Sequence, residues 1–296
     1  LKKERNAIIL AHYYQDPEIQ DIADFMGDSL ALAQHAQKTT AEIILFCGVH
    51  FMSETAKILN PTKTVLIPDL DAGCSLADSA SSSSFKAWVE DHPKHTLVSY
   101  INCSAEVKAM SDIICTSSNA EKIINSIPNN QPILFAPDQF LGKFLIKKTT
   151  RELILWKGFC QVHVLFSLKA LIKLKIRYPK AEVIAHPECE EKILNQADFI
   201  GSTTGLINYT QSSLSTEFIV VTEPGVIHQM QKINPQKKYI PLSNNEGCAC
   251  NECPHMRLNT IDKMIKALET LQPEIILNRD LIEQAKKPLI KMLELS

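Results

Sequence analysis

Cysteines are the residues of this chain most able to do chemistry, and there are nine of them in 296 residues. Their number is odd and their spacing is irregular, which argues against the disulfide framework of a secreted domain. In a reducing compartment such a set indicates metal ligation or catalysis, together with some buried thiols. The densest group is Cys248, Cys250 and Cys253. It could belong to a zinc site, form a redox pair, or supply one ligand, and it lacks the second C-x-x-C of a self-contained zinc ribbon.

Three cysteines share a position relative to predicted strands. Cys74, Cys160 and Cys253 each follow a short apolar stretch and lie near a glycine. Three thiolates would hold a cubane iron–sulfur cluster with one iron left open to substrate. The remaining cysteines lie beside apolar residues, and we interpret them as small buried hydrophobic side chains. They are Cys47, Cys103, Cys115 and Cys189.

Polar side chains also stand where three predicted strands end. They are His12 with Tyr14, Tyr100 with Asn102, and His186 with Glu188. In parallel α/β sheets, ligands bind outside the carboxyl ends of the strands. A single histidine at a strand end is more often structural than catalytic, but three equivalent polar ends favour one shared pocket. Histidine and glutamate there could transfer protons.

Hydroxyl side chains occupy the expected starts of three helices: Ser29, Ser117, and Ser202 with Thr203. Capping of the helix is the common role of serine and threonine there. Three helix N-termini that converge on one pocket would also bind anions. The pattern therefore suits a substrate that carries carboxylates or phosphate.

An internal repeat supplies the elements that must position these groups. Each copy has an apolar strand, a helical stretch, and an aspartate followed five residues later by serine or threonine. The aspartates Asp24, Asp112 and Asp198 are 88 and 86 positions apart. Strands that alternate with helices predict parallel βαβ units, near residues 6–80, 95–165 and 181–253. The last apolar stretch of the third unit is short, only residues 239–240 before Pro241.

The helical stretches between the units predict that the three units form a closed triangle. Stretches at 84–91 and 166–177 open the second and third units, and a last one near 260–271 should pack back on the first. We therefore predict an α/β protein of three pseudo-threefold-related αβα domains around a central cluster and active site. The predicted domains are residues 1–80 with the C-terminal helices 256–296, residues 81–165, and residues 166–255.

Composition and charge exclude several classes of protein. With 45% hydrophobic and 22% charged residues the chain is globular rather than disordered. A net charge of −2 gives no positive field for nucleic acid. No apolar run approaches the roughly 20 residues of a membrane-spanning helix, and no signal-peptide pattern is present. We expect a cytoplasmic enzyme with no nucleic-acid or membrane partner.

Seven short motifs, taken together, resemble those of quinolinate synthase. They are HYYQ at 12–15, ADFMGDSL at 23–30, FMSETA at 51–56, GFCQVH at 158–163, HPEC at 186–189, ST at 202–203 and CPHM at 253–256. Each motif is weak alone, but they keep the family's order over almost the whole chain. Two positions depart from the family pattern, Tyr13 and Phe140, where asparagine is expected.

The resemblance implies a reaction and a set of site residues. The reaction is the condensation of iminoaspartate with dihydroxyacetone phosphate to quinolinate, with release of phosphate and water, on the route to NAD. Such a transferase would hold one [4Fe–4S] cluster through Cys74, Cys160 and Cys253 and use the open iron as a Lewis acid. Tyr14, His186 and Glu188 are the predicted catalytic residues. The predicted substrate-binding residues are His12, Ser29, Tyr100, Asn102, Ser117, Ser202 and Thr203.

The resemblance also bears on partners and on regulation. The expected partners are the two small-molecule substrates, with a functional link to an aspartate-oxidising enzyme. Some family members share the neighbours Cys248 and Cys250, so redox sensitivity of this segment is a further hypothesis.

Two other readings use the same cysteines. A zinc enzyme would lack the brown colour and the iron of an anaerobically purified iron–sulfur protein. A non-catalytic redox or iron sensor would hold a cluster without a small-molecule pocket, and the polar strand ends argue against it. An electron carrier is disfavoured, because a fourth equivalent cysteine ligand is missing from the repeat pattern.

Overall fold

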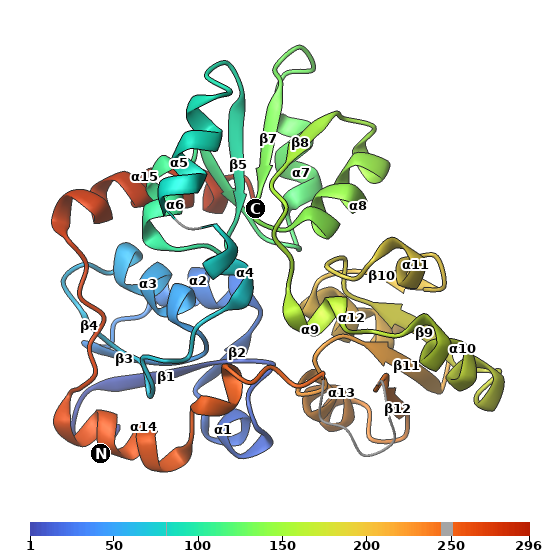
Figure 1. The fold of residues 1–296 in the computed structure, drawn as a ribbon. Helices are drawn as coiled ribbons and strands as arrows, with labels where there is room; N and C mark the ends of the chain where they lie inside the picture. Colours follow the sequence, from blue (N-terminus) through green and yellow to red (C-terminus); the bar gives the residue numbers. More distant parts are fainter. Residues whose placement is uncertain (81, 244–250) are drawn as a thin grey trace.

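The computed structural model describes residues 1–80, 82–243 and 251–296 and contains three four-stranded sheets (Figure 1). Neighbouring strands pair in parallel in each sheet. Helices flank all three sheets (Figure 1). The predicted fold class, α/β with three αβα units, is therefore confirmed. Cys248 and Cys250 lie outside the described residues, so the hypothesis about their redox state stays a hypothesis.

The three sheets share one topology, in which the first strand of each unit lies between the second and the third. The first sheet has the order β2 (Phe25–Gly27), β1 (Ala7–His12), β3 (Ile43–Cys47), β4 (Thr64–Leu66). The second has the order β6 (Ile113–Cys115), β5 (Thr96–Tyr100), β7 (Ile133–Ala136), β8 (Leu153–Leu155). The third has the order β10 (Phe199–Ile200), β9 (Glu182–Ala185), β11 (Glu217–Val221), β12 (Lys238–Pro241).

Burial explains the apolar runs that form these strands. Every residue of β3 and of β7 is buried. Strands of parallel sheets are covered on both faces and therefore read as continuous apolar runs rather than alternating ones. The strand β12 is longer than predicted and includes Pro241, which an edge strand tolerates because one side of its backbone has no partner strand.

Helices connect the strands within each unit and between units. The first unit has α1 (Pro17–Ile22), α2 (Ser29–Lys38) and α3 (His50–Leu59). The second is opened by α4 (Ser75–Ser79) and α5 (Ser82–Glu90) and contains α6 (Ala105–Met110), α7 (Ala120–Ser126) and α8 (Gln139–Thr149). The third is opened by α9 (Gln161–Val164) and α10 (Leu168–Arg177) and contains α11 (Glu191–Leu194), α12 (Thr203–Ser212) and α13 (Val226–Ile233). The chain ends with η1 (Met256–Leu258), α14 (Ile261–Thr270) and α15 (Arg279–Glu294). No helix in the described part of the chain is long and apolar enough to cross a membrane.

The repeated aspartate has the same structural role in all three units. Its Oδ2 accepts a hydrogen bond from a backbone N–H in the first strand of the unit. The pairs are Asp24 with Ile9 at 2.8 Å, Asp112 with Leu97 at 2.7 Å, and Asp198 with Val183 at 2.7 Å. The aspartate therefore fastens the start of the second strand to the first, which accounts for its place in the repeat.

One helix starts later than the sequence predicts. Ser29 and Thr203 are the first residues of α2 and α12, as predicted. Ser117 is not the start of a helix, because α7 begins at Ala120. Asn119 Oδ1 accepts the backbone N–H of Thr116 at 2.6 Å, and this side-chain turn delays the helix by three residues.

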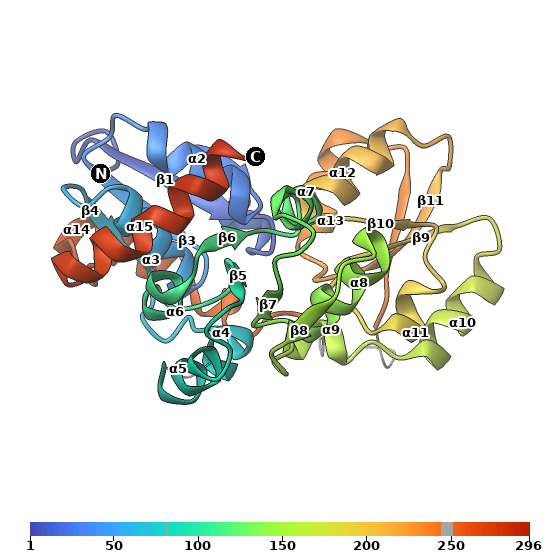
Figure 2. The ribbon, with the colours of Figure 1, turned by 90° about the horizontal axis from the view of Figure 1, so that it is seen from above.

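The two C-terminal helices pack on different parts of the molecule (Figures 1 and 2). Helix α14 buries Met264, Ala267 and Leu268 in a cluster with residues of β1 and β3, so it covers the first sheet. Helix α15 packs against α6 and β6 of the second unit and against α3 of the first. It therefore ties the first two units together. The domain boundaries themselves stay a prediction.

Candidate active site

The carboxyl ends of the three sheets meet at one pocket that encloses about 720 Å³ of space, its open mouth included. All the predicted site residues except Ser202 line this pocket. His12 and Tyr14 come from the end of β1, Tyr100 and Asn102 from the end of β5, and His186 and Glu188 from the end of β9. The remaining predicted residues in the lining are Ser29, Ser117, Thr203, Cys74, Cys160 and Cys253. Pseudo-threefold repetition therefore builds one pocket out of three strand ends.

Ser202 is the predicted site residue that does not line the pocket. Its Oγ accepts the backbone N–H of Gly205 at 3.1 Å and so caps α12. Thr203, the next residue, does face the pocket. Ser202 thus fixes the helix start that presents Thr203.

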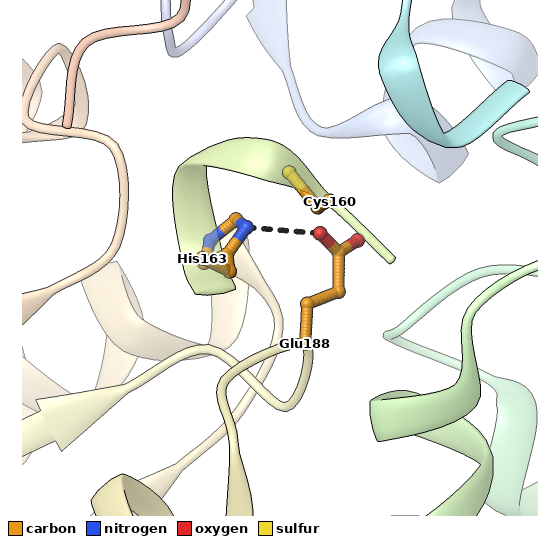
Figure 3. A group of neighbouring side chains, drawn as sticks. All are labelled: Cys160, His163 and Glu188. Atoms are coloured by element: carbon orange, nitrogen blue, oxygen red, sulfur yellow. Dashed lines mark ion pairs between the residues drawn. The ribbon is translucent and has the colours of Figure 1, made fainter. Parts of the chain in front are cut away.

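Two phenols anchor a chain of hydrogen-bonding groups across the pocket. Tyr14 Oη lies 2.7 Å from Thr222 Oγ1, and that oxygen lies 3.0 Å from His163 Nε2. His163 Nδ1 lies 2.9 Å from Glu188 Oε2, the ion pair drawn in Figure 3. Tyr100 Oη donates to Glu188 Oε1 at 2.6 Å. The chain joins residues from all three units and could carry a proton between the two phenols.

Local structure places His163 beside Cys160. Cys160 immediately precedes the short helix α9, and His163 follows it by three residues on the same turn (Figure 3). The imidazole is buried and stacks on that of His186, with ring centroids 4.9 Å apart. His163 was not among the predicted site residues. Its spacing from Cys160 within the GFCQVH motif is the signal that could have found it.

Burial sets the protonation of the two phenols. Burial raises the pKa of Tyr14 well above its ordinary value, although hydrogen bonds with Thr203 and Thr222 oppose the shift. Burial and the nearby Glu188 carboxylate raise the pKa of Tyr100 in the same direction. Both phenols therefore keep their protons near neutral pH and can act as acids.

The pKa values of Glu188, His186 and His12 are all lowered, but burial opposes the shift of Glu188 and causes that of the two histidines. Burial alone would raise the pKa of Glu188, but His163, His186 and the hydrogen bond from Tyr100 outweigh it and lower the pKa to about 2. Burial lowers the pKa of His186 to about 3 and that of His12 to about 4. Near neutral pH Glu188 is thus a carboxylate, and His12 and His186 are uncharged imidazoles that can accept protons.

The three candidate ligand cysteines share one environment. Burial raises the pKa of Cys74 to about 12, and Cys253 adds to the shift. Burial, Glu188 and Cys74 raise the pKa of Cys160 well above its ordinary value. Backbone N–H groups of the turn that follows each cysteine act the other way and favour the thiolate. The thiols are thus close enough to disfavour one another's ionisation.

A positively charged centre would resolve this repulsion. Among the described residues that line the pocket, none is lysine or arginine. Three partly buried cysteines that line one pocket, with no lysine or arginine in its described lining, match the donor set of an iron–sulfur cluster. The residues present therefore fit such a group.

The spacing of the donors differs between the three cysteines and a second group of possible ligands. Within the described residues, one set of three donors lies mutually within 4.8 Å, and it consists of Cys160, His163 and Glu188. The three cysteines do not form such a set, whereas two thiolates on a tetrahedral zinc ion lie about 3.8 Å apart. His163 and Glu188 already contact each other, and His163 also contacts Thr222. These two side chains are therefore arranged both to exchange a proton with each other and, with Cys160, to contact a metal ion.

Sequence reasoning also missed Glu223, which lines the pocket, and Arg257, which pairs with it. Glu223 follows β11 and is fully buried, and its Oε1 accepts from Arg257 Nη2 at 2.7 Å and from the N–H of Cys253 at 3.4 Å. Arg257 Nη1 donates to the carbonyl of Tyr14 at 2.7 Å. These contacts join the loop of the third cysteine to the loop of Tyr14. The polar pair Thr222-Glu223 at a strand end was the available signal.

The four cysteines predicted to be structural are buried, as expected: Cys47, Cys103, Cys115 and Cys189.

Tyr13 and Phe140, the two residues that depart from the expected motifs, both have defined contacts in the structure. Tyr13 packs, partly buried, against the apolar cluster of the third unit. Phe140 is the second residue of α8, where its N–H donates to Asp138 Oδ1 at 2.8 Å and its ring lies 5.2 Å from Lys143 Nζ.

Known proteins of one kind match the chain along its whole length. The family model described as quinolinate synthetase A protein matches residues 1–294. The quinolinate synthase of Rippkaea orientalis is 60% identical over 296 residues, covering 100% of this chain and 91% of that protein. That of Cyanophora paradoxa is 60% identical, covering 100% and 90%. That of a Synechocystis strain is 58% identical, covering 100% and 93%.

Proposed function

The chain belongs to the quinolinate synthase family, and we propose that its central pocket condenses iminoaspartate with dihydroxyacetone phosphate. The products are quinolinate, phosphate and two molecules of water. The observation that carries this proposal is the convergence of three thiols and three acid–base strand ends in one pocket. A cluster-bearing sensor would account for the thiols but not for the acid–base groups, and a zinc enzyme with the same cysteines would differ in its metal content.

The cofactor that fits is one [4Fe–4S] cluster per chain, held by Cys74, Cys160 and Cys253. With three protein ligands one iron stays open, so the bound cluster supplies Lewis acidity toward substrate oxygen without net electron transfer. This role agrees with the absence of lysine and arginine from the described lining of the pocket.

Substrate anions would be held by hydroxyls and by helix starts. Ser29 and Thr203 are the first residues of α2 and α12 and line the pocket, as does Ser117. Backbone N–H groups at helix starts bind carboxylate and phosphate groups. Asn102 Oδ1 is buried and has no partner within the described protein, which suits an atom that orients substrate. His12 and Tyr100 complete the binding surface.

The hydrogen-bonding chain of the pocket suits the proton transfers of the reaction. Forming the carbon–carbon bond requires a proton to leave carbon, and each dehydration requires a proton to reach the departing hydroxyl. Glu188, a carboxylate near neutral pH, would accept the first, and Tyr14, a protonated phenol, would donate the second. His163 and Thr222 lie between them and can return the proton from Glu188 to Tyr14. His186, uncharged, is a second acceptor.

The chemistry also suggests where the substrate comes from and where the protein works. An imine of this kind hydrolyses in water, so an aspartate-oxidising enzyme must supply it close to where it is used. The described cysteines are all unpaired, which suits a reducing compartment such as the cytoplasm. We therefore propose that this transferase works in the cytoplasm.

The test is product formation by the anaerobically purified protein. Quinolinate and an equal amount of phosphate should form only when iminoaspartate and dihydroxyacetone phosphate are both present. A Cys160→Ala variant should lose both the iron and the product. A wild-type sample with a complete cluster and both substrates, but no quinolinate, would refute the proposal.

A further inference from the structure

The boundary between the first and second units contains a buried lysine and a buried glutamate that the proposed reaction does not use. Lys108 on α6 is 0% exposed, and Glu54 on α3 is 5% exposed. Neither lines the pocket. Burying a charge is costly unless it has partners, so the contacts of these two side chains indicate what the charges are for.

Both side chains hold the backbone of one short loop. Lys108 Nζ donates a hydrogen bond to the carbonyl of Cys103. Glu54 Oε2 accepts the backbone N–H of Ala105 at 3.0 Å. These two contacts lie immediately after Asn102, whose side chain lines the pocket. The loop that carries Asn102 is thus fixed by one residue from its own unit and one from the neighbouring unit.

Lys108 also contacts an apolar part of the pocket wall, and Glu54 lies on the helix that forms it. Lys108 Nζ lies 5.3 Å from the centre of the Phe51 ring, within the range of a cation–π contact. Phe51 lies in the first turn of α3 and lines the pocket with Met52. Glu54 is on the same helix, where its Oε1 lies 3.7 Å from His50 Nδ1. The two charges therefore connect an apolar wall from the first unit to a polar loop from the second.

We propose that Glu54 and Lys108 are positioning residues that set Asn102 relative to the wall formed by Phe51 and Met52, and so control how substrate is oriented. The inference rests on the proposed function of the pocket. Neither side chain touches substrate. Burial raises the pKa of Glu54, and the attraction of Lys108 and His50 opposes that shift, as expected if the charges stabilise each other.

Lys57 provides a matched control. It lies on α3 three residues after Glu54, is 9% exposed, and pairs with Glu274 at 3.0 Å. Its Nζ also donates to a backbone carbonyl, that of Lys63, at 2.8 Å. It does not line the pocket. Lys57→Met and Lys108→Met therefore remove equivalent charges and hydrogen bonds at two distances from Asn102.

The kinetic test is a double-mutant cycle in the iron-loaded enzyme. Lys108→Met should lower kcat/KM about 10- to 100-fold, because small misplacements of a positioning group have effects of this size. In an Asn102→Ala background the same substitution should change kcat/KM less than about threefold, because its effect passes through Asn102. Lys57→Met should leave kcat/KM within about twofold of the wild type in either background. An equal loss from Lys108→Met with and without Asn102 would overturn the proposal.

A second variant separates positioning from stability. Lys108→Met removes one of the two attractions on the buried Glu54 charge and leaves only that of His50, so the protein should melt at a lower temperature. Adding Glu54→Gln removes that poorly compensated charge and keeps an oxygen to accept from the N–H of Ala105. The double variant should regain most of the melting temperature but not the lost kcat/KM. Recovery of both together would assign the pair a purely structural role.

Hydrogen exchange tests the same proposal without any substrate. Peptides that cover residues 102–106 should exchange at least about tenfold faster in Lys108→Met than in the wild type, and Lys57→Met should match the wild type. If the wild type makes no quinolinate but exchange follows this pattern, the proposed function fails and the positioning role stands. Unchanged exchange in Lys108→Met would refute the positioning role whatever the activity.

Discussion

Glu188 contacts His163 on one side and Tyr100 on the other, and these contacts determine which protonation state each group takes. The carboxylate stays charged because an imidazole and a phenol donate toward it, and the phenols stay protonated because burial disfavours their ionisation. Acid and base roles are therefore set by the surroundings of each side chain and not by its type alone.

Removing the charge of Glu188 should affect turnover and leave the cluster intact. Glu188→Gln keeps the size of the side chain and its contact with Tyr100 but removes the base. We expect kcat to fall by about 10²- to 10⁴-fold, the usual contribution of a general base. Iron and sulfide contents should equal those of the wild type. Unchanged turnover would rule out Glu188 as the base.

Thr222 should matter through its hydroxyl alone. Thr222→Val keeps the shape of the side chain but breaks the link between Tyr14 and His163. We expect kcat to fall about tenfold or more. Thr210→Val, which loses a buried hydroxyl that donates to the carbonyl of Ile207 and does not line the pocket, is the matched control and should not change kcat. Equal effects in both variants would mean that the link carries no proton.

The buried histidines predict a dependence of stability on pH. The pKa values of His12 and His186 are about 4 and 3 in the folded protein, below their ordinary 6.5. The unfolded chain therefore takes up protons between about pH 6.5 and 4 that the folded protein does not, so stability falls as the pH falls through this range. Each histidine contributes up to about 1.4 kcal/mol per pH unit.

Melting temperature measured from pH 7.5 to 5 checks this prediction. The decline below pH 6.5 should be shallower in His186→Gln than in the wild type, because one of the two groups no longer takes up a proton on unfolding. Parallel curves would show that His186 is already protonated in the folded protein or that it is not shielded from water.

The strand–turn–helix elements explain why the polar strand ends could be predicted from the sequence. Apolar runs followed by His12, Tyr100 and His186 show where parallel strands end, and those ends must lie on one edge of each sheet. The hydrogen bonds between these side chains could not be predicted from the sequence. Thr222 and His163, for example, are 59 residues apart and meet only in the folded chain. Ser117 was misjudged as a helix start because the turn made by Asn119 competes with the helix.

The repeated aspartates make a prediction at the level of the element. Asp112→Ala removes the hydrogen bond to the N–H of Leu97, which is partly buried. The loss should lower the free energy of unfolding by about 1 kcal/mol, the usual contribution of one hydrogen bond. Activity at low temperature should not change, because Asp112 is remote from the lining. Asp91→Ala, at an exposed aspartate with no side-chain hydrogen bond in the described structure, should change stability by less than about 0.5 kcal/mol. Equal effects would remove the structural role assigned to the repeat.

At the scale of the whole molecule, three copies of one unit place three cysteines and three polar strand ends around a single pocket. Periodic patterns in the sequence were enough to predict the three units and the return of α14 to the first sheet. They could not predict that α15 packs on α6 and β6 as well as on α3, because an apolar helix face shows that a helix is covered but not by what.

The central claim is that the junction of the three units holds an iron–sulfur cluster that serves the condensation. The most direct test measures iron, sulfide and quinolinate formation in one anaerobically purified sample. We expect about four irons and four sulfides per chain, with quinolinate formed from iminoaspartate and dihydroxyacetone phosphate. Zinc in place of iron, or a complete cluster that yields no quinolinate, would contradict this account of the pocket.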